Sequence, residues 1–311
     1  LTTGVVTASI VTTETVDSLK TLTGTNNAYT IVISERAASA SDLNAINELT
    51  TATVDLTNVT SVTSSALSDL DTLADAINAT PAQFINATNL ATSAVSDSEI
   101  DITSSAETID ALDQIDDDSI DMTMASGATI NVDAGEIAAM LADETAGRLT
   151  IGDQNITVTG EISVEDANKL NKTTTGTITA TIESSSAASL TTLEGTNAYT
   201  ITIQASETGI TASQLTIISN ATTEPVDASG VTGLASDNIS NIKTLLTAGN
   251  DTAQFTEDSF SLLATVDVSD GTLSGSDLAD AIDQANAATG NTTTVFTITA
   301  AVEITLSLIH I

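Results

Sequence analysis

The chain has 311 residues, and its 42 acidic against 6 basic side chains give a net charge of −36 at pH 7. Such an excess of carboxylates repels nucleic acids and anionic membrane surfaces, because both need Lys and Arg to neutralise phosphate. The absence of Cys excludes disulfides, thiolate metal sites and Cys nucleophiles. Hydrophobic residues make up 41% and aromatic residues only 2%, so the expected core consists of small aliphatic side chains in thin layers.

Short segments in which apolar residues alternate with Thr, Ser or Asp recur along the chain. This period of two predicts half-buried strands with one face in water. The expected inward-facing sets are Val6, Ala8 and Ile10; Tyr29, Ile31 and Ile33; Val54 and Leu56; Ile120, Met122 and Met124; Ile130 and Val132; Ile156 and Val158; Ile178, Ala180 and Ile182; Tyr199, Ile201 and Ile203; Val266 and Val268; and Phe296, Ile298 and Ala300.

Between these strands lie short segments with apolar residues three or four positions apart, a spacing that predicts amphipathic helices. The expected helix residues are Val16, Leu19 and Leu22; Leu43, Ile46 and Leu49; Leu67, Leu70, Leu73 and Ile77; Ile109 and Leu112; Ile137, Met140 and Leu141; Leu190 and Leu193; Leu215 and Ile218; Ile239, Ile242 and Leu245; and Leu278 and Ile282.

Six of the expected helix starts carry a capping-box pattern. In such a box, a Ser, Thr or Asp accepts from the backbone N–H three residues on, and the side chain there reaches back to the cap. Each box contributes about 1 kcal/mol to a short helix. The pairs are Ser39/Asp42, Ser104/Glu107, Asp133/Glu136, Ser163/Asp166, Thr211/Gln214 and Ser274/Asp277.

The order of strand and helix patterns predicts an α/β repeat solenoid, with a parallel sheet on one side and short helices on the other. Strands joined by helical crossovers run parallel, and each small unit must stack on its neighbours to bury its apolar faces. We expect residues 1–305 to form one continuous array of strand–helix repeats, each about 22–30 residues long. The alternative is an all-β solenoid in which the helical patterns are loops.

The ends of the chain suggest a fragment. Its first residue is Leu1 and no signal peptide is visible, so we expect an internal piece of a longer protein. Residues 306–311, LSLIHI, contain the single His and break the preceding Thr/Asp/Ala composition. They are similar to a translated sequencing adapter, which predicts a non-native tail; the alternative is an ordinary strand end. His310 is therefore not used as evidence for a site.

Two acidic clusters are candidate calcium sites, because calcium prefers six to eight oxygen ligands around one loop. The candidate ligands are Asp113, Asp116, Asp117, Asp118 and Asp121 in the first cluster and Asp267 and Asp270 in the second. Neither cluster has the EF-hand spacing, and no GGxGxD nonapeptide occurs. A solvated acidic turn is the alternative interpretation of both.

Rows of Thr could form a flat hydroxyl lattice for binding ice or carbohydrate. The alternative is that Thr simply suits the exposed face of a strand. The rows are Thr157 and Thr159; Thr177, Thr179 and Thr181; Thr200 and Thr202; and Thr297 and Thr299.

Enzymatic sites find little support in the composition. A Ser-His-Asp triad or a His-ligated metal would need the doubtful His310. Paired carboxylates could serve a glycosidase, but the aromatic side chains that stack on sugars are scarce. We therefore expect that the chain is not an enzyme.

Several phrases recur in variant form, among them TTGVVTAS, SASDLNAIN, TTATVDLT and GTNAYTITI. They resemble the Thr/Ala/Asp-rich tandem repeats of giant cell-surface proteins of marine cyanobacteria and other marine bacteria. The resemblance covers most of residues 1–305 and rests on low-complexity motifs, so it specifies a repeat type. It implies an exported, extracellular or cell-surface array with a structural, adhesive or motility-related role, and it transfers no catalytic residues.

The sequence thus predicts a non-enzymatic structural fragment of a long secreted or cell-surface repeat protein, such as an adhesin, a surface layer or a motility-associated spacer. The alternative is a carbohydrate- or ice-binding module that uses the Thr-rich sheet face. Expected partners are neighbouring repeats, surface polysaccharide or another surface protein. Membrane insertion is not expected, because no apolar run approaches the roughly 18 residues of a spanning helix. Calcium is the one cofactor considered.

Overall fold

The computed structural model describes residues 4–24, 26–87, 93–102, 122–147, 149–204, 209–257, 259–269, 272–289, 294–298 and 303–305. The described chain is a mixed α/β structure. Short helices lie between short strands along the chain, and the strands form mostly parallel sheets. This confirms the predicted α/β class, and the all-β alternative is wrong because helices occupy the segments with apolar residues three or four apart. The chain divides into two compact units, Leu1–Thr157 with Thr173–Gly176, and Val158–Lys172 with Thr177–Ile311.

The first unit contains several small parallel sheets. One has the order β1 (Thr7–Ser9), β2 (Ala28–Val32), β4 (Val54–Asp55) and β6 (Phe84–Ile85). The others join β3 (Ala37–Ala38) to β5 (Ser61–Val62); β7 (Ser93–Val95) to β9 (Met122–Met124) and β11 (Leu149–Thr150); and β8 (Glu99–Ile102) to β10 (Thr129–Asp133).

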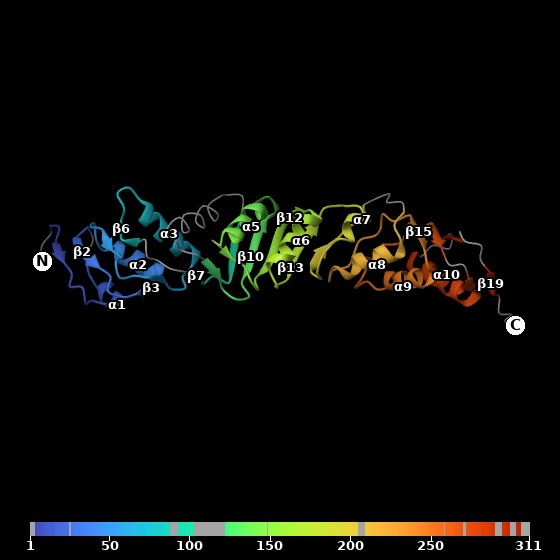
Figure 1. Ribbon diagram of the computed structural model, residues 1–311, viewed down its shortest axis with the longest axis horizontal. Helices are drawn as coiled ribbons and strands as arrows, with labels where there is room; N and C mark the ends of the chain where they lie inside the picture. The colour runs from blue at the N-terminus through green and yellow to red at the C-terminus, as the bar shows by residue number, and fades with distance from the viewer. Residues whose placement is uncertain are drawn as a thin grey trace. The chain divides into compact units, whose positions relative to one another are not determined.

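The helices of the first unit are α1 (Val16–Leu19), α2 (Ala40–Asn47), α3 (Leu67–Asn78), the 3₁₀ turn η2 (Ala134–Glu136) and α5 (Ile137–Ala146). Helices α2 and α3 pack side by side (Figure 1). Strand β12 (Asn155–Ile162) begins in the first unit and ends in the second.

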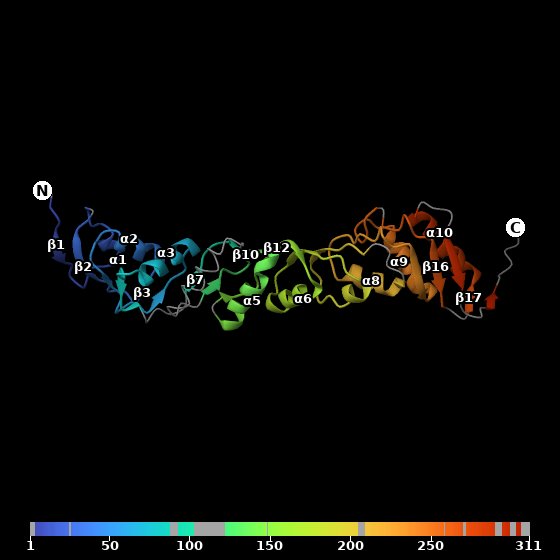
Figure 2. The ribbon, with the colours of Figure 1, turned by 90° about the horizontal axis from the view of Figure 1, so that it is seen from above.

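The second unit repeats the alternation of strand and helix. Its helices are α6 (Val164–Thr173), α7 (Ala187–Leu190), α8 (Ala212–Asn220), α9 (Ile239–Gly249) and α10 (Gly275–Thr289). Its strands are β13 (Ile178–Ile182), β14 (Ala198–Thr200), β15 (Gly233–Asp237), β16 (Thr265–Val268), β17 (Thr272–Ser274), β18 (Val295–Ile298) and β19 (Glu303–Thr305). The parallel pairings are β13 with β14, β15 with β16, β16 with β18, and β17 with β19. Helices α8, α9 and α10 follow one another as packed neighbours (Figure 2).

Strand β13 shows why the alternating pattern produces these sheets. Ile178, Ala180 and Ile182 are buried, whereas Thr179 between them is exposed. Burial of the aliphatic face stabilises the strand, and Thr fits the solvated face. The predicted inward- and outward-facing positions of this strand are confirmed.

The capping prediction is confirmed in part. At α8 the complete box forms: the Thr211 N–H donates to Gln214 Oε1 at 2.9 Å, and the Gln214 N–H donates to Thr211 Oγ1 at 3.1 Å. At three other starts the serine hydroxyl accepts from the N–H three residues on, but the Asp there binds elsewhere. These starts are Ser39/Asp42, Ser163/Asp166 and Ser274/Asp277. Asp is one methylene shorter than Glu or Gln, so its carboxylate takes the serine hydroxyl or a lysine instead.

The predicted box at Asp133 and Glu136 is wrong. Asp133 makes no side-chain capping bond, because η2 comes first and α5 begins only at Ile137. The box at Ser104 and Glu107 lies outside the described residues, as does the helix expected around Ile109 and Leu112.

Candidate functional site

A buried polar network links neighbouring strands of the first unit. Asn27 Oδ1 accepts from the Val6 N–H at 2.9 Å, and Asn27 Nδ2 donates to the Tyr29 hydroxyl at 3.0 Å. The Tyr29 N–H donates to Thr50 Oγ1 at 2.9 Å, and the Thr50 hydroxyl donates back to the Tyr29 carbonyl at 2.8 Å. One Asn and one Thr therefore tie together β1, β2 and the turn before β4.

The same network occurs in the second unit. Asn197 Oδ1 accepts from the Ile178 N–H at 3.1 Å, and Asn197 Nδ2 donates to the Tyr199 hydroxyl at 3.2 Å and to Asn171 Oδ1 at 3.0 Å. The Tyr199 N–H donates to Thr222 Oγ1 at 3.0 Å, and the Thr222 hydroxyl donates to the Tyr199 carbonyl at 2.6 Å. Burial raises the pKa of Tyr199 to about 12, so its phenol stays neutral at physiological pH.

A Thr-Thr dipeptide forms a hydrogen bond with the turn just before the preceding strand at three places. The N–H of the second Thr donates to a main-chain carbonyl there: Thr51 to Asn27 at 2.7 Å, Thr175 to Gly152 at 2.9 Å and Thr223 to Asn197 at 2.8 Å. Sequence reasoning assigned Thr to exposed strand faces and missed this role. The recurrence of Thr-Thr shortly after a helix was the signal that could have revealed it.

Lysine side chains connect successive helices on the surface. Lys20 Nζ lies 2.5 Å from Asp42 Oδ1, which joins α1 to α2. Lys243 Nζ lies 3.1 Å from Asp277 Oδ1 and 3.2 Å from Asp280 Oδ2, which joins α9 to α10. Exposed pairs of this kind contribute little to stability, because water and salt screen them. These ion pairs connect successive helices but add little to their stability.

Replacing Lys20 with Met is expected to raise the pKa of Asp42. The hydrogen bond from Lys20 lowers the pKa of that carboxyl in the wild type, against an opposing effect of desolvation and with a smaller contribution from Ser39. A lowered folded-state pKa gives stability that is present above the ordinary value of about 4 and is lost as the pH falls through the lowered value. The measurement is an NMR titration of the Asp42 carboxyl carbon.

The matched control for this titration is Lys172→Met, which removes a pair with Glu194 at 3.2 Å in the other unit. It should leave the Asp42 pKa unchanged. An Asp42 pKa that is the same in wild type and Lys20→Met would show that the ion pair is absent in solution.

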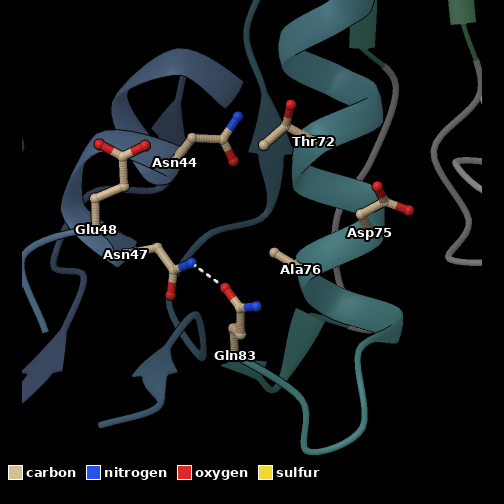
Figure 3. A pocket seen from close by; sticks show the side chains of 7 residues that line it. All are labelled: Asn44, Asn47, Glu48, Thr72, Asp75, Ala76 and Gln83. Carbon is tan, nitrogen blue, oxygen red and sulfur yellow. Dashed lines mark hydrogen bonds between the residues drawn. The ribbon is translucent and has the colours of Figure 1, made fainter. Parts of the chain in front are cut away.

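A hollow of about 250 Å³ lies between α2 and α3 (Figure 3). Its lining residues are Asn44, Asn47, Glu48, Thr72, Asp75, Ala76 and Gln83. A hydrogen bond from Asn47 Nδ2 to Gln83 Oε1 crosses one side of it. Glu48 and Asp75 lie at opposite ends, and no Lys, Arg, His, Cys or aromatic side chain is among the lining residues.

The side chains of this hollow can donate and accept hydrogen bonds, and its two carboxylates can attract cations. Asn44 Nδ2 donates to the Asp69 carbonyl at 2.8 Å, and Asn44 Oδ1 is buried without a hydrogen-bond partner in the described part of the chain. The Thr72 hydroxyl donates to the Ser68 carbonyl at 2.9 Å, so it is held as a helix side chain.

Of the predicted calcium ligands, only Asp267 is placed by the structure. It lies half-buried in β16, in register with Thr297 of β18. The other candidates lie outside the described residues: Asp113, Asp116, Asp117, Asp118, Asp121 and Asp270. Within the described ranges, no group of three or more His, Cys, Asp or Glu side chains is arranged to hold a metal ion.

The predicted Thr rows are interrupted where strands pair. Thr181 faces Thr200 across β13 and β14, but Thr179 faces Ala198. Thr202 forms its bridge with Asp227. The hydroxyl groups of these strands therefore alternate with other side chains and do not form a regular lattice.

In comparisons with known proteins, no family model, no curated protein and no solved structure matches the chain. Among the described helices, none is both long and apolar enough to cross a membrane.

Proposed function

We propose that this chain is a non-enzymatic structural segment of a long secreted or cell-surface repeat protein, in which residues 1–305 form one α/β solenoid. The observation that carries the proposal is the repeated polar network. Asn27, Tyr29 and Thr50 recur with the same donors and acceptors as a second set, Asn197, Tyr199 and Thr222. Because the same network occurs in two copies of the unit, we attribute it to the repeat and not to one local site.

The networks suit a spacer because the Asn Oδ1 and Thr Oγ1 atoms bond to main-chain groups, while the Asn Nδ2 bonds to the Tyr hydroxyl within the same network. Stability of a stacked array depends on the interfaces between successive units, since each unit contacts only its neighbours. Asn and Thr satisfy buried N–H and C=O groups at those interfaces, which would otherwise destabilise the array. The Asn and Thr side chains of the networks therefore stabilise the fold, and we assign them no role in binding a substrate.

The charge and the resemblance to marine bacterial surface repeats support an exported location. A net charge of −36 keeps neighbouring molecules apart at low salt, and salt water screens that repulsion within about 8 Å or less. Neighbouring repeats, surface polysaccharide or another surface protein remain the proposed partners, and calcium remains a candidate ligand of the acidic run at 113–121. The interrupted Thr rows lend no support to ice or carbohydrate binding.

Small-angle X-ray scattering of the full chain tests the solenoid. A compact domain of this length has a radius of gyration of about 20 Å. An array that grows by stacking exceeds that value clearly, because each unit adds length along one axis. We expect a radius of gyration well above the compact value at both low and high salt. A value near that of a compact domain would refute the stacked array.

A further inference from the structure

Three helices bond to the helix that follows them through the same position, the fifth residue after the N-cap. We call it the linking position. The N-caps and linking residues are Thr15 and Lys20 for α1, Ser39 and Asn44 for α2, and Asn238 and Lys243 for α9. Each of the three side chains donates to a residue of the following helix. Comparison of the three junctions therefore shows which groups each one contains.

At two of these junctions the linking residue supplies an ammonium group. Lys20 Nζ lies 2.5 Å from Asp42 of α2, and Lys243 Nζ lies 3.1 Å from Asp277 of α10. Both acceptors occupy the same place in their helices, three residues after the serine that accepts from their N–H. A lysine between two helices and a carboxylate near the start of the second one thus form a recurrent pair.

The junction of α2 with α3 has the carboxylate but lacks the ammonium group. Asp69 lies three residues after Ala66, the N-cap of α3, as Asp42 and Asp277 do after their caps. The linking residue is Asn44, and its Nδ2 donates to the main-chain carbonyl of Asp69 at 2.8 Å. The carboxylate of Asp69 has no cationic partner in the described part of the chain.

Helix α6 shows an Asn in the same place with both of its amide atoms bonded. Asn168 lies five residues after Ser163; its Nδ2 donates to the Thr192 carbonyl and its Oδ1 accepts from the Glu194 N–H, both at 2.8 Å. The following helix, α7, has only 4 residues, so the chain beyond it has an N–H to donate. Helix α3 has 12 residues and uses its N–H groups internally. Asn44 Oδ1 therefore lacks the donor that Asn168 has.

The hollow between α2 and α3 lies at this junction, and its lining has an excess of acceptors (Figure 3). Asn44 Oδ1 is buried without a partner, and the carboxylates of Glu48 and Asp75 have neither a donor nor a cation in the described part of the chain. The volume of about 250 Å³ compares with about 30 Å³ for one water molecule in the liquid. A ligand of several non-hydrogen atoms would fit.

The corresponding hollow between α9 and α10 has a volume of about 400 Å³ and includes Lys243 in its lining. One lining side chain donates to the Oε1 atom of a glutamine in each hollow, Asn47 to Gln83 in the first and Thr247 to Gln284 in the second. The two hollows therefore share their position between successive helices and a glutamine contact. Only the second has an ammonium group of its own.

The lining between α2 and α3 calls for a ligand that carries positive charge and only donates hydrogen bonds. A primary ammonium group has three donors and no acceptor. Calcium prefers six to eight oxygen ligands, and no group of three or more His, Cys, Asp or Glu side chains in the described ranges is arranged to hold a metal ion.

We propose that the hollow between α2 and α3 binds the ammonium group of a primary alkylamine, at the place where Lys243 inserts its own ammonium group between α9 and α10. The net charge of −36 adds a favourable field for any cation. The proposal concerns the first unit alone and does not depend on the stacking of repeats.

An NMR titration of the full chain tests the proposal through the side-chain amide signals of Asn44, Asn47 and Gln83. The probes are butylammonium chloride and tetramethylammonium chloride at equal ionic strength. We expect a saturable shift of these signals with butylammonium. Tetramethylammonium has the same charge but no N–H, so it should bind at least about tenfold more weakly. Equal responses to the two ions would show general screening and would overturn the proposal.

Reciprocal substitutions at the linking position give a second test. Asn44→Lys places in α2 the residue that α9 has, and it should abolish the response to butylammonium. Lys243→Asn removes the ammonium group between α9 and α10, and it should create a saturable response at the side-chain amide of Gln284. Circular dichroism verifies that both variants are folded. A folded Asn44→Lys variant that responds like the wild type, or a folded Lys243→Asn variant that gains no response, overturns the proposal.

Discussion

Replacing Asn197 with Ala is expected to lower the free energy of unfolding by about 2–4 kcal/mol, because each buried group left unpaired costs about 1–3 kcal/mol. Asn197 is 5% exposed, and its amide serves three partners. Removal leaves the Ile178 N–H without its acceptor in a strand that is fully buried on that face. The Tyr199 hydroxyl loses a donor as well.

The matched control is Asn27→Ala in the first unit, where the same two contacts exist but the strand end is half-buried. Water can reach Val6 more easily than Ile178, so the loss should be smaller. Urea unfolding gives the free-energy change, and hydrogen exchange at the Ile178 amide locates it. Equal losses in the two variants would show that burial does not set the size of the effect, and no loss in Asn197→Ala would show that the network does not hold adjoining strands together.

The extent of the increase in hydrogen exchange distinguishes a stacked array from a single cooperative core. In an array, a destabilised unit opens with its neighbours while distant units keep their protection. Asn197→Ala should therefore increase exchange in β13 and β14 and leave β2 protected. A uniform increase along the whole chain would favour one global unfolding transition.

Alternation of apolar and polar residues predicted some of the strands, such as β2 and β13, but not β8 or β15. In β2 and the residue after it, Tyr29, Ile31 and Ile33 are buried as expected. A period of two places alternate side chains on one face, and that face is the one buried in the core. Helix α6 was harder to predict, because Ala167 supplies its middle apolar contact. A methyl group carries little hydrophobic signal, and only the Ser163 cap marked the helix start.

The polar contacts between strands could not be predicted from hydropathy. Asn197 and Thr222 are polar by type, and nothing in a hydrophobic pattern places them at 5% and 7% exposure. Their burial is possible because the parallel strands leave main-chain groups unpaired at the turns, and these two side chains satisfy them. The repeated Asn-Ala-Tyr and Thr-Thr phrases held this information, but only comparison of the two copies in space reveals the pairing.

Replacing Thr222 with Val is expected to destabilise the second unit by about 2–4 kcal/mol while preserving the shape of the side chain. The Thr222 hydroxyl donates to the Tyr199 carbonyl at 2.6 Å and accepts from the N–H groups of Tyr199 and Glu224, each at 3.0 Å. Val fills the same volume but leaves all three main-chain groups unpaired. The measurement is the urea midpoint and the slope of the transition.

Thr244→Val is the matched control for this substitution, because the Thr244 hydroxyl donates to the Ser240 carbonyl at 2.9 Å on the exposed face of α9. Water replaces that bond, so the control should lose less than about 0.5 kcal/mol. Thr50→Val should cause a smaller loss in the first unit, because the hydroxyl makes the same contacts with Tyr29 but is only half-buried. If Thr222→Val proved as mild as Thr244→Val, the Thr residues would be ordinary turn residues, and the repeated network would no longer explain how successive strands are held.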